Sequence, residues 1–397
     1  MKILMLTPYL PFPLMSGGQT RSYNLLKNLS KKHEITLFSL VKDDKERKNI
    51  PELEKFCKKV RVFNRPPKPW TLSNILRTGF GPYPFLVIRN LATEESRAIK
   101  DELASNDYDL IHAETFYVMP HIPKTKVPIL LVEQTIEYLV YKHYVEEQAP
   151  KFLAPLLKID VKKLKYWETY FWKHAKKVVA MSDSDRIQMK KLCQGLSIDI
   201  VPNGIDAEYF LAKKKEEVYP PKVLYVGNFT WLQNIEAVED LVNKVWPEIK
   251  KAVTNAKLWI VGMHMTDYIK NLKSDDIEVT EGMPDIRDAY KRSTVLVTPI
   301  RGPGGTRLKI LEAMASALPV VTTTVGAEGL GVSSGKEALI TDNLDDLVKS
   351  AVEVLRNPAV AKKLGESGRA FVEKNYTWDV SAEKLDRIYE EIVNENQ

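Results

Sequence analysis

Short apolar runs alternate with longer stretches of helical periodicity along almost the whole chain. The runs are rich in β-branched and other apolar residues, which is typical of strands buried on both faces. Helical patterns lie between most of them, so the alternation predicts parallel sheets covered by helices on both sides. The predicted strands lie at 2–7, 34–40, 59–63, 109–113, 128–133, 177–181 and 198–201 in the first half, and at 222–227, 256–262, 277–282, 295–299, 319–323 and 338–341 in the second.

The segment 202–221 interrupts this alternation. It begins with Pro-Asn-Gly, continues through a charged run and ends in Pro-Pro before a new strand starts. Such segments carry few packing contacts, so we interpret it as the linker and hinge between two doubly wound domains. We predict an N-terminal domain at 1–205, a C-terminal domain at 206–377, and a C-terminal helix at 378–397 that crosses back to the first domain.

Composition and charge narrow the class of protein. A chain of 397 residues is long enough for two domains, and its net charge of +6 suits anionic partners. Cys57 and Cys193 form no metal-binding or disulfide pattern, so we expect a reducing cytoplasm. Pro8 and Pro11 come too early for a signal-peptide core, and no apolar run approaches the ~20 residues that span a bilayer.

A glycine-rich loop after the predicted strand 295–299 gives the strongest chemical signal. Gly302, Gly304 and Gly305 let the backbone turn tightly and approach a ligand closely. Thr306 suits the N-cap of the helix that follows. Because a helix amino end presents free N–H groups and partial positive charge, this loop predicts a diphosphate site.

Charged residues in the first turns of that helix strengthen the prediction. Arg307 and Lys309 add positive charge for a diphosphate, and Glu312 lies where a carboxylate can accept both hydroxyls of a ribose. The structural alternative is a glycine loop with a solvated helix end. The order Arg, Lys, Glu at this spacing favours the nucleotide site.

The residues that follow carry a family resemblance. Glu312, Ala313, Met314 and Ala315 resemble the end of the donor-binding signature of the retaining GT-B glycosyltransferases, the glycosyltransferase family 4-like group. That signature has an earlier Glu at the position of Gly304, so this chain resembles a branch with a Gly-Gly-Thr-Arg-x-Lys donor loop. The resemblance implies the GT-B fold: two Rossmann-like α/β domains that face a cleft. It also implies that the domain at 1–205 lies on the acceptor side and that the domain at 206–377 binds the nucleotide-sugar donor.

Other segments extend the resemblance over both domains. The Asn-Gly after the strand 198–201 resembles a strand end that meets the cleft, and the turn at 227–228 resembles the start of the donor domain. The family often has Arg or Lys at Asn228 and Gln233, so we assign the diphosphate charge to Arg307 and Lys309 instead. The resemblance implies nucleotide-sugar contacts for Gly17, Gly18, Asn203, Gly204, Gly227, Asn228, Met283, Gly304, Gly305, Thr306, Leu308 and Glu312.

In the first domain, the end of the predicted strand 109–113 carries the candidate catalytic carboxylate. His112 and Glu114 resemble a family pattern that has a second His at the position of Glu114, which places Glu114 near the reacting sugar. The structural alternatives are a packed strand histidine and a helix-capping acid. Arg21 follows the glycine loop as either a phosphate partner or a solvated residue, and Glu133 and Glu137 are possible acceptor contacts.

The resemblance also implies an activity. It implies sugar transfer from a nucleotide-diphosphate sugar to a glycan or lipid-linked acceptor of polysaccharide or cell-envelope synthesis, with retention of configuration. Glu114, Arg307 and Lys309 carry the catalytic roles, without a metal, a further cofactor or a nucleic-acid partner. Front-face attack is the family's usual mechanism, and Glu114 leaves double displacement open. The alternatives are a GT-B epimerase, a pyridoxal-dependent phosphorylase and a degenerate sugar-nucleotide binding protein.

Two segments of the first domain suggest peripheral membrane contact at the inner membrane face. The stretch 151–177 interleaves lysines with Tyr166, Trp167, Tyr170, Phe171 and Trp172. Basic and aromatic residues favour anionic membrane interfaces. The stretch 66–85 is aromatic and basic without a clear period, so we expect a flexible insertion there. A helix with one packed face and one solvated lysine face is the alternative for the first stretch.

Overall fold

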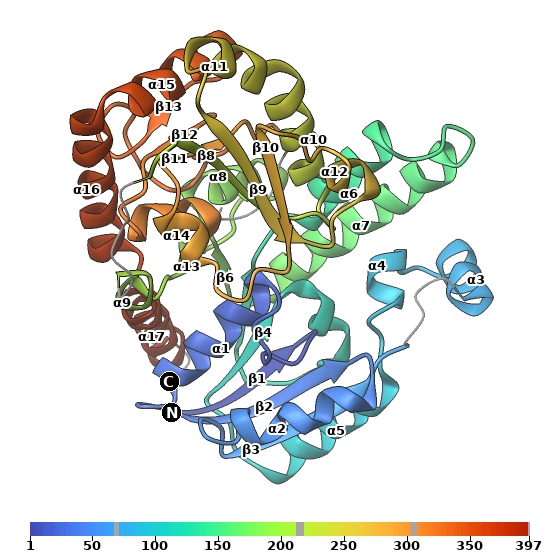
Figure 1. Cartoon of the computed structure of the whole chain (residues 1–397). Coiled ribbons are helices and arrows are strands. Elements are labelled where there is room, and N and C mark those ends of the chain that lie inside the picture. Colours follow the sequence, from blue (N-terminus) through green and yellow to red (C-terminus); the bar gives the residue numbers. More distant parts are fainter. Residues whose placement is uncertain (67–70, 212–217, 303–307, 396–397) are drawn as a thin grey trace. The chain divides into compact units, whose positions relative to one another are not determined.

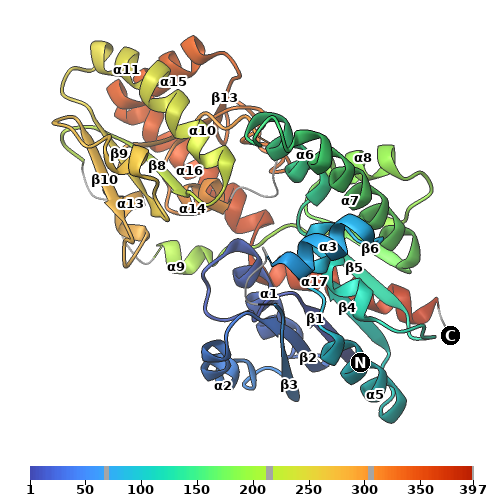
Figure 2. The ribbon, with the colours of Figure 1, turned by 90° about the vertical axis from the view of Figure 1, so that its right-hand side faces the viewer.

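The computed structural model describes the chain except for residues 67–70, 212–217, 303–307 and 396–397. The chain divides into two compact units: unit 1 comprises Met1–Asn203 and Trp378–Gln397, and unit 2 comprises Gly204–Thr377 (Figure 1, Figure 2). Each unit has its own parallel sheet covered by helices on both faces, so the predicted fold class is confirmed. Among the described residues, no helix has the length and apolar character needed to cross a membrane.

Unit 1 is built on a seven-stranded parallel sheet with the order β3-β2-β1-β4-β5-β6-β7. Its strands are β1 (Lys2–Thr7), β2 (Glu34–Val41), β3 (Lys59–Asn64), β4 (Leu110–Glu114), β5 (Ile129–Glu133), β6 (Lys177–Ala180) and β7 (Ile198–Ile200). Each one coincides with a predicted strand to within a residue or so at either end, which confirms the reading of the apolar runs.

The apolar side chains of β1 explain why this sheet needs helices on both faces. Leu4 and Leu6 pack into one buried cluster, whereas Ile3 and Met5 pack into another, because successive strand residues point to opposite faces. The helices of unit 1 are α1 (Gly17–Leu29), η1 (Asp44–Asn49), α2 (Ile50–Leu53), α3 (Leu72–Phe80), α4 (Phe85–Ile88), α5 (Thr93–Ser105), η2 (Phe116–His121), α6 (Glu137–Glu147), α7 (Ala154–His174), α8 (Asp183–Leu192) and α17 (Trp378–Asn394).

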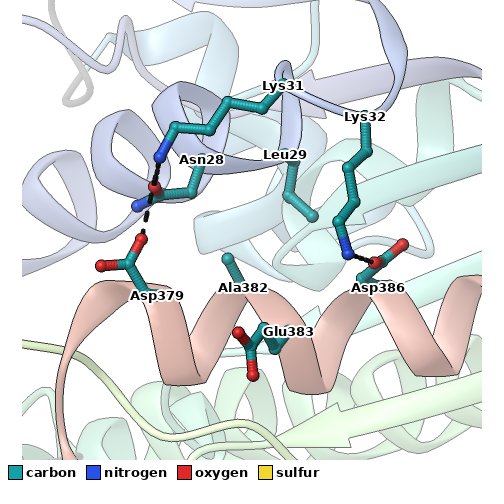
Figure 3. A pocket seen from close by; sticks show the side chains of 8 residues that line it. All are labelled: Asn28, Leu29, Lys31, Lys32, Asp379, Ala382, Glu383 and Asp386. Atoms are coloured by element: carbon teal, nitrogen blue, oxygen red, sulfur yellow. Dashed lines mark hydrogen bonds and ion pairs between the residues drawn. The ribbon is translucent and has the colours of Figure 1, made fainter.

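The last helix, α17, belongs to unit 1 although it follows the whole of unit 2 in sequence. Leu385, Ile388 and Ile392 join the cluster that also contains Leu25 and Leu29 of α1. Charged residues at the edge of the contact between α1 and α17 line a small pocket of about 170 Å³ (Figure 3). There, Lys32 Nζ lies 2.5 Å from Asp386 Oδ2, and Lys31 Nζ lies 3.8 Å from Asp379 Oδ1.

Unit 2 contains a six-stranded parallel sheet with the order β10-β9-β8-β11-β12-β13. Its strands are β8 (Lys222–Asn228), β9 (Lys257–Met263), β10 (Ile277–Glu281), β11 (Val295–Thr298), β12 (Val320–Thr322) and β13 (Leu339–Ile340). Its helices are α9 (Ala207–Leu211), α10 (Leu232–Asp240), the π-helical turn η3 (Leu241–Val245), α11 (Trp246–Ala252), α12 (Asp267–Lys270), α13 (Arg287–Lys291), α14 (Leu308–Ala315), α15 (Leu344–Arg356) and α16 (Pro358–Asn375). All six strands fall on predicted runs.

The predicted flexible insertion at 66–85 is wrong over part of its length. Residues Leu72–Phe80 form the helix α3, whose N-cap Thr71 accepts a hydrogen bond from the backbone N–H of Asn74. The large apolar side chains of α3, Leu72, Ile75, Leu76 and Phe80, recur at helical spacing but are exposed. The sequence therefore carried a periodic signal for this helix, which the interpretation of 66–85 as a stretch without a clear period missed.

Candidate active site

In unit 2, Lys309 lies in the first turn of α14 and reaches the end of β8. Its Nζ atom lies 2.6 Å from Asn234 Oδ1 and 3.3 Å from Tyr225 Oη, and stands over the Tyr225 ring at 4.5 Å from the centroid. Asn234 is held in turn, because its Nδ2 donates to the backbone carbonyl of Asn228 at 2.7 Å. The ammonium group is therefore fixed at the carboxyl end of the sheet, where open α/β sheets bind ligands.

Glu312 follows Lys309 by three residues, so both side chains project from neighbouring positions of α14. Its Oε2 atom accepts a 2.6 Å hydrogen bond from the hydroxyl of Tyr290 on α13. Burial raises the pKa of the Glu312 carboxyl, while the Tyr290 hydrogen bond and the charge of Lys309 act in the opposite direction. The helix thus presents a cation and a carboxyl group side by side.

Glycines at three strand ends of unit 2 permit a very close approach between chain segments. A Cβ atom on Gly262, in β9, would lie 2.0 Å from the carbonyl oxygen of Gly227 in β8. A Cβ atom on Gly302, after β11, would lie 2.9 Å from Cβ of Gln233 in α10. A side chain does not fit at either position, so both positions require glycine. The ends of β8, β9 and β11 can therefore approach neighbouring segments closely.

The remaining predicted donor-side residues lie around the same sheet edge or outside the described residues. Asn228 ends β8, and its Oδ1 accepts hydrogen bonds from the backbone N–H and hydroxyl of Thr230. Met283 and Leu308 are half-buried against the core beneath α13 and α14. Gly204 is the buried first residue of unit 2. The predicted residues Gly304, Gly305, Thr306 and Arg307 lie outside the described residues.

In unit 1, the predicted catalytic residue Glu114 ends β4 and is completely buried. Its Oε2 lies 2.7 Å from His112 Nε2, and its Oε1 accepts a 2.7 Å hydrogen bond from Gln134 Nε2. Arg21 Nε lies 3.4 Å from the same Oε1 atom. Burial raises the pKa of the Glu114 carboxyl, but the hydrogen bond and charge of His112, followed by Arg21 and Gln134, outweigh it and leave this pKa below its ordinary value.

Arg21 connects the Glu114 carboxylate to Pro202 and Asn203, at the end of the first segment of unit 1. It is fully buried, and its Nη1 donates to the backbone carbonyl of Pro202 and to Asn203 Oδ1, both at 3.1 Å. The interpretation of Arg21 as a solvated residue is therefore wrong. The predicted site residue Asn203 is the partner that orients its guanidinium.

His112 links the same cluster to the last helix. A carboxylate can only accept hydrogen bonds, so Nε2 of His112 carries the hydrogen that faces Glu114. The other ring nitrogen, Nδ1, is hydrogen-bonded to the hydroxyl of Tyr389 on α17. His112 is thus the packed strand histidine of the structural alternative, and it also holds Glu114.

The predicted glycine loop packs directly on this cluster. Gly17 begins α1, whose N-cap Ser16 accepts a hydrogen bond from the backbone N–H of Gln19. A Cβ atom on Gly18 would lie 2.6 Å from both Gln134 Oε1 and the Tyr9 hydroxyl, so a side chain there would displace these two groups of the cluster. Tyr9 in turn accepts a 2.6 Å hydrogen bond from Gln134.

The backbone is strained immediately after Glu114. Thr115 has φ 68 and ψ 154, a region that non-glycine residues rarely occupy. Such strain persists only where the surrounding structure enforces it, and it tends to occur at functional sites. Tyr9, Gln134 and Tyr389 were missed by the sequence interpretation; of these, only Gln134 carried a signal, because it directly follows a predicted strand.

The two predicted acceptor contacts, Glu133 and Glu137, belong to a separate group of buried carboxyls. Trp172 Nε1 donates to Glu133 Oε1 at 2.9 Å, and Glu168 accepts the backbone N–H groups of Glu137 and Tyr138 at the start of α6. Burial raises the pKa of Glu133 well above its usual range, that of Glu137 to about 7 and that of Glu168 to about 8. Neither this group nor any other set of three His, Cys, Asp or Glu side chains among the described residues is arranged to hold a metal ion.

Comparison with known proteins assigns both units to known domains. The family described as Glycosyltransferase Family 4 matches residues 15–209, and the family described as Glycosyl transferases group 1 matches residues 220–357. A relative from Klebsiella pneumoniae, described as an uncharacterized 44.6 kDa protein in the cps region, is 24% identical over 393 residues, which cover 94% of this chain and 96% of the relative.

Solved structures share the fold over nearly the whole length. Sucrose-phosphate synthase from Thermosynechococcus elongatus has a TM-score of 0.73 at 19% identity, covering 99% of both chains. The Anabaena protein HepE, solved in complex with UDP-glucose, has a TM-score of 0.66 at 15% identity, covering 98% of this chain and 100% of HepE. At these low sequence identities, the structural similarity establishes the fold alone.

Proposed function

We propose that this chain, a GT-B glycosyltransferase with a family 4 domain and a group 1 domain, transfers a sugar from a nucleoside-diphosphate sugar to a glycan or lipid-linked acceptor with retention of configuration. The observation that carries this proposal is the pairing of Lys309 and Glu312 on α14 at the carboxyl edge of the sheet in unit 2. A fixed cation beside a carboxyl group matches a diphosphate joined to a ribose. The HepE complex with UDP-glucose supports this ligand class.

In this proposal, Lys309 neutralises the diphosphate leaving group. Asn234 and Tyr225 already hold its ammonium group, so little reorganisation is needed when a phosphate arrives. Arg307 adds a second charge and the amino end of α14 adds partial positive charge, which together let the reaction proceed without a metal. Gly227, Asn228 and Leu308 line the diphosphate in this proposal, and the family resemblance of the sequence implies the same role for Gly304, Gly305 and Thr306.

Glu312 recognises the nucleoside. Tyr290 fixes one oxygen of its carboxyl group, which orients the group for the two ribose hydroxyls. Burial disfavours the ionised form of Glu312, so hydrogen bonds donated by the two ribose hydroxyls would stabilise that form when the nucleotide is bound. Met283 supplies an apolar contact for the base.

Glu114 supplies negative charge on the acceptor side. Its low pKa keeps it ionised, so it stabilises the positive charge that develops on the transferred sugar. Both of its oxygens are engaged by His112, Gln134 and Arg21, which favours a fixed electrostatic role over nucleophilic attack. Front-face attack then accounts for retention, and Gly17, Gly18, Asn203 and Gly204 position the donor and acceptor. We place the activity in the cytoplasm.

The experiment is a nucleotide-release assay with UDP-, GDP- and ADP-sugars, run with and without a glycan acceptor and with excess EDTA. We expect one nucleotide class to be released in an acceptor-dependent manner, with activity that survives EDTA. Sugar interconversion without an acceptor would identify an epimerase instead. Binding of a nucleotide sugar without any turnover would identify a degenerate binding protein, and abolition by EDTA with rescue by manganese would reject the metal-independent mechanism.

A further inference from the structure

Large apolar side chains are concentrated on one part of the surface of unit 1. Among the described residues, eighteen such side chains are exposed, and nine of them fall within the segments 72–80 and 152–166. We call these nine the docking surface: Leu72, Ile75, Leu76, Phe80, Phe152, Leu153, Leu156, Ile159 and Tyr166. The fractional exposure reaches 90% for Phe80 and 80% for Phe152. Contiguous apolar surface of this kind marks an interaction site.

The spacing on α7 shows that its apolar stripe is additional to the packed face. Leu156, Ile159 and Tyr166 recur at helical intervals on α7 and therefore share one face, and Phe152 and Leu153 are exposed just before this helix. The core contacts of α7 come from other residues, including Leu164 and Trp172, which are fully buried. The exposed stripe does not serve the packing of unit 1.

Specific hydrogen bonds join α3 to the same face of α7. Lys163 continues the stripe of Ile159 and Tyr166, and its Nζ donates to the backbone carbonyls of Thr78 at 2.6 Å and Gly81 at 2.8 Å. The carboxyl end of α3 is therefore fixed beside the stripe, so the exposed apolar residues of the two helices lie on neighbouring parts of unit 1. Figure 1 and Figure 2 show where α3 and α7 lie within this unit.

The charges around the docking surface are basic. Between residues 151 and 165, the exposed charged side chains are Lys151, Lys158, Lys162 and Lys165, whereas Asp160 is buried and accepts the backbone N–H of Phe85. On α3 the charged residue is Arg77, which is exposed. Nearby acids lie at the end of α6, where Glu146 pairs with Lys142 at 3.7 Å and Glu147 is exposed.

We propose that α3 and the first half of α7 dock unit 1 onto the surface of an anionic lipid bilayer. Apolar side chains would enter the boundary between headgroups and acyl chains, while the lysines and Arg77 contact anionic headgroups. The aromatic rings expected from the sequence to mediate this contact are mostly in the core: Phe171 and Trp172 are buried, and Trp167 stacks against Tyr83. The surface that faces the membrane is instead largely aliphatic.

The test is co-sedimentation of the full chain with phosphatidylcholine vesicles that contain an increasing fraction of phosphatidylglycerol, at low ionic strength. We expect binding that rises with the anionic fraction and weakens with salt. The triple variant Phe80→Ser, Leu156→Ser, Ile159→Ser should lose at least about tenfold in partition coefficient, and Lys158→Gln with Lys162→Gln about threefold to tenfold. Circular dichroism and thermal melting should match the wild type.

Matched controls come from exposed residues elsewhere. Ile187→Ser on α8 and Tyr219→Ser in unit 2 remove exposed apolar side chains, and Lys190→Gln with Lys191→Gln removes exposed lysines of unit 1. These variants should bind vesicles like the wild type. The assay uses no sugar donor, so its result is independent of the proposed transferase activity.

Three outcomes would overturn the proposal. The first is the absence of vesicle binding by the wild type at low salt, and the second is binding by the triple variant equal to that of the wild type. The third is a concentration-dependent dimer in sedimentation velocity that the triple variant abolishes while vesicle binding stays absent. That result would assign the docking surface to a second copy of this chain.

Discussion

The two units have the same doubly wound architecture but hold their polar site residues in different ways. In unit 2, Lys309 and Glu312 are half-buried. Lys309 is hydrogen-bonded to Asn234 and Tyr225, and Glu312 is hydrogen-bonded to Tyr290. In unit 1, Arg21 and Glu114 are completely buried within one network. The first arrangement can exchange a protein partner for a ligand, whereas the second is part of the structural core.

This difference separates two kinds of mutational effect. Removing one member of a buried charge network leaves its partner desolvated and unpaired, so stability falls together with activity. Removing a half-buried side chain at a ligand edge leaves the core intact, so activity falls alone. Four predictions test this separation, beginning with the largest expected free-energy change.

Replacement of Arg21 should have the largest effect on stability. Arg21→Ala leaves the Glu114 carboxylate buried without its cation and removes the hydrogen bonds to Pro202 and Asn203. We expect a loss of about 3–5 kcal/mol in the free energy of unfolding, measured by urea denaturation. The control Arg47→Ala, which breaks an exposed pair with Asp44, should cost at most about 1 kcal/mol. An Arg21 variant as stable as that control would contradict the comparison.

Replacement of Lys309 should affect activity without affecting stability. Lys309→Ala removes the cation that we propose neutralises the leaving diphosphate, so kcat/KM should fall about 10²–10³-fold. The melting temperature should stay near the wild-type value. Lys222→Ala is a matched control, because Lys222 also stands over an aromatic ring of the same sheet, Trp259 at 4.6 Å, but at the opposite end of β8. Equal activity loss in both variants would remove Lys309 from the site.

Glu312→Ala should accompany Lys309→Ala in this test, with a different kinetic signature. Loss of the ribose contact should raise KM for the donor by about 10–100-fold, since a hydrogen bond to a carboxyl group contributes about 1.5–3 kcal/mol. Wild-type kinetics in both variants would refute the donor-site assignment.

Replacement of Tyr389 should lower both the stability and kcat, each to an intermediate extent. Tyr389→Phe removes the hydroxyl bonded to Nδ1 of His112 and leaves that buried nitrogen without this partner, which costs about 1–3 kcal/mol of stability. Because His112 orients Glu114, kcat should also fall several-fold while the donor KM is unchanged. Tyr376→Phe in unit 2 removes a comparable 2.7 Å hydrogen bond, to the carbonyl of Leu330, and should lower stability without lowering kcat.

The strands and the helix α14 could be predicted because each is encoded by neighbouring residues. Buried strands appear as apolar runs, and all thirteen strands found in the described part of the chain fall on such runs. The pairing of Lys309 with Glu312 follows from helical spacing alone. The partners Tyr225, Asn234 and Tyr290 come from other elements, so no local pattern indicates them.

The network around Glu114 could not be predicted for the same reason. His112 and Tyr389 are 277 positions apart, and Gln134 and Tyr9 are 125 apart. Only the return of α17 to unit 1 brings Tyr389 to β4, and a tyrosine on the apolar face of a helix gives no sign of a polar role. The burial of Arg21 was missed because arginine is almost never fully buried without a partner, and its partners are distant in sequence.

The pH dependence of stability offers the subtlest test, through Glu133. Burial, followed by the charge of Glu168, raises the pKa of Glu133 well above its unfolded value, so the folded state binds more protons. Stability from this group is therefore present at low pH and is lost as pH rises from the unfolded pKa toward the folded one.

Glu133→Gln keeps an oxygen for Trp172 Nε1 and removes this titration. Between about pH 5 and pH 8, the variant should gain at least about 1 kcal/mol relative to the wild type in urea denaturation. Glu137 and Glu168 retain raised pKa values and leave a residual slope in both proteins. The exposed control Glu147→Gln should follow the wild type, and a parallel pH profile for Glu133→Gln would mean that Glu133 is already ionised in the fold.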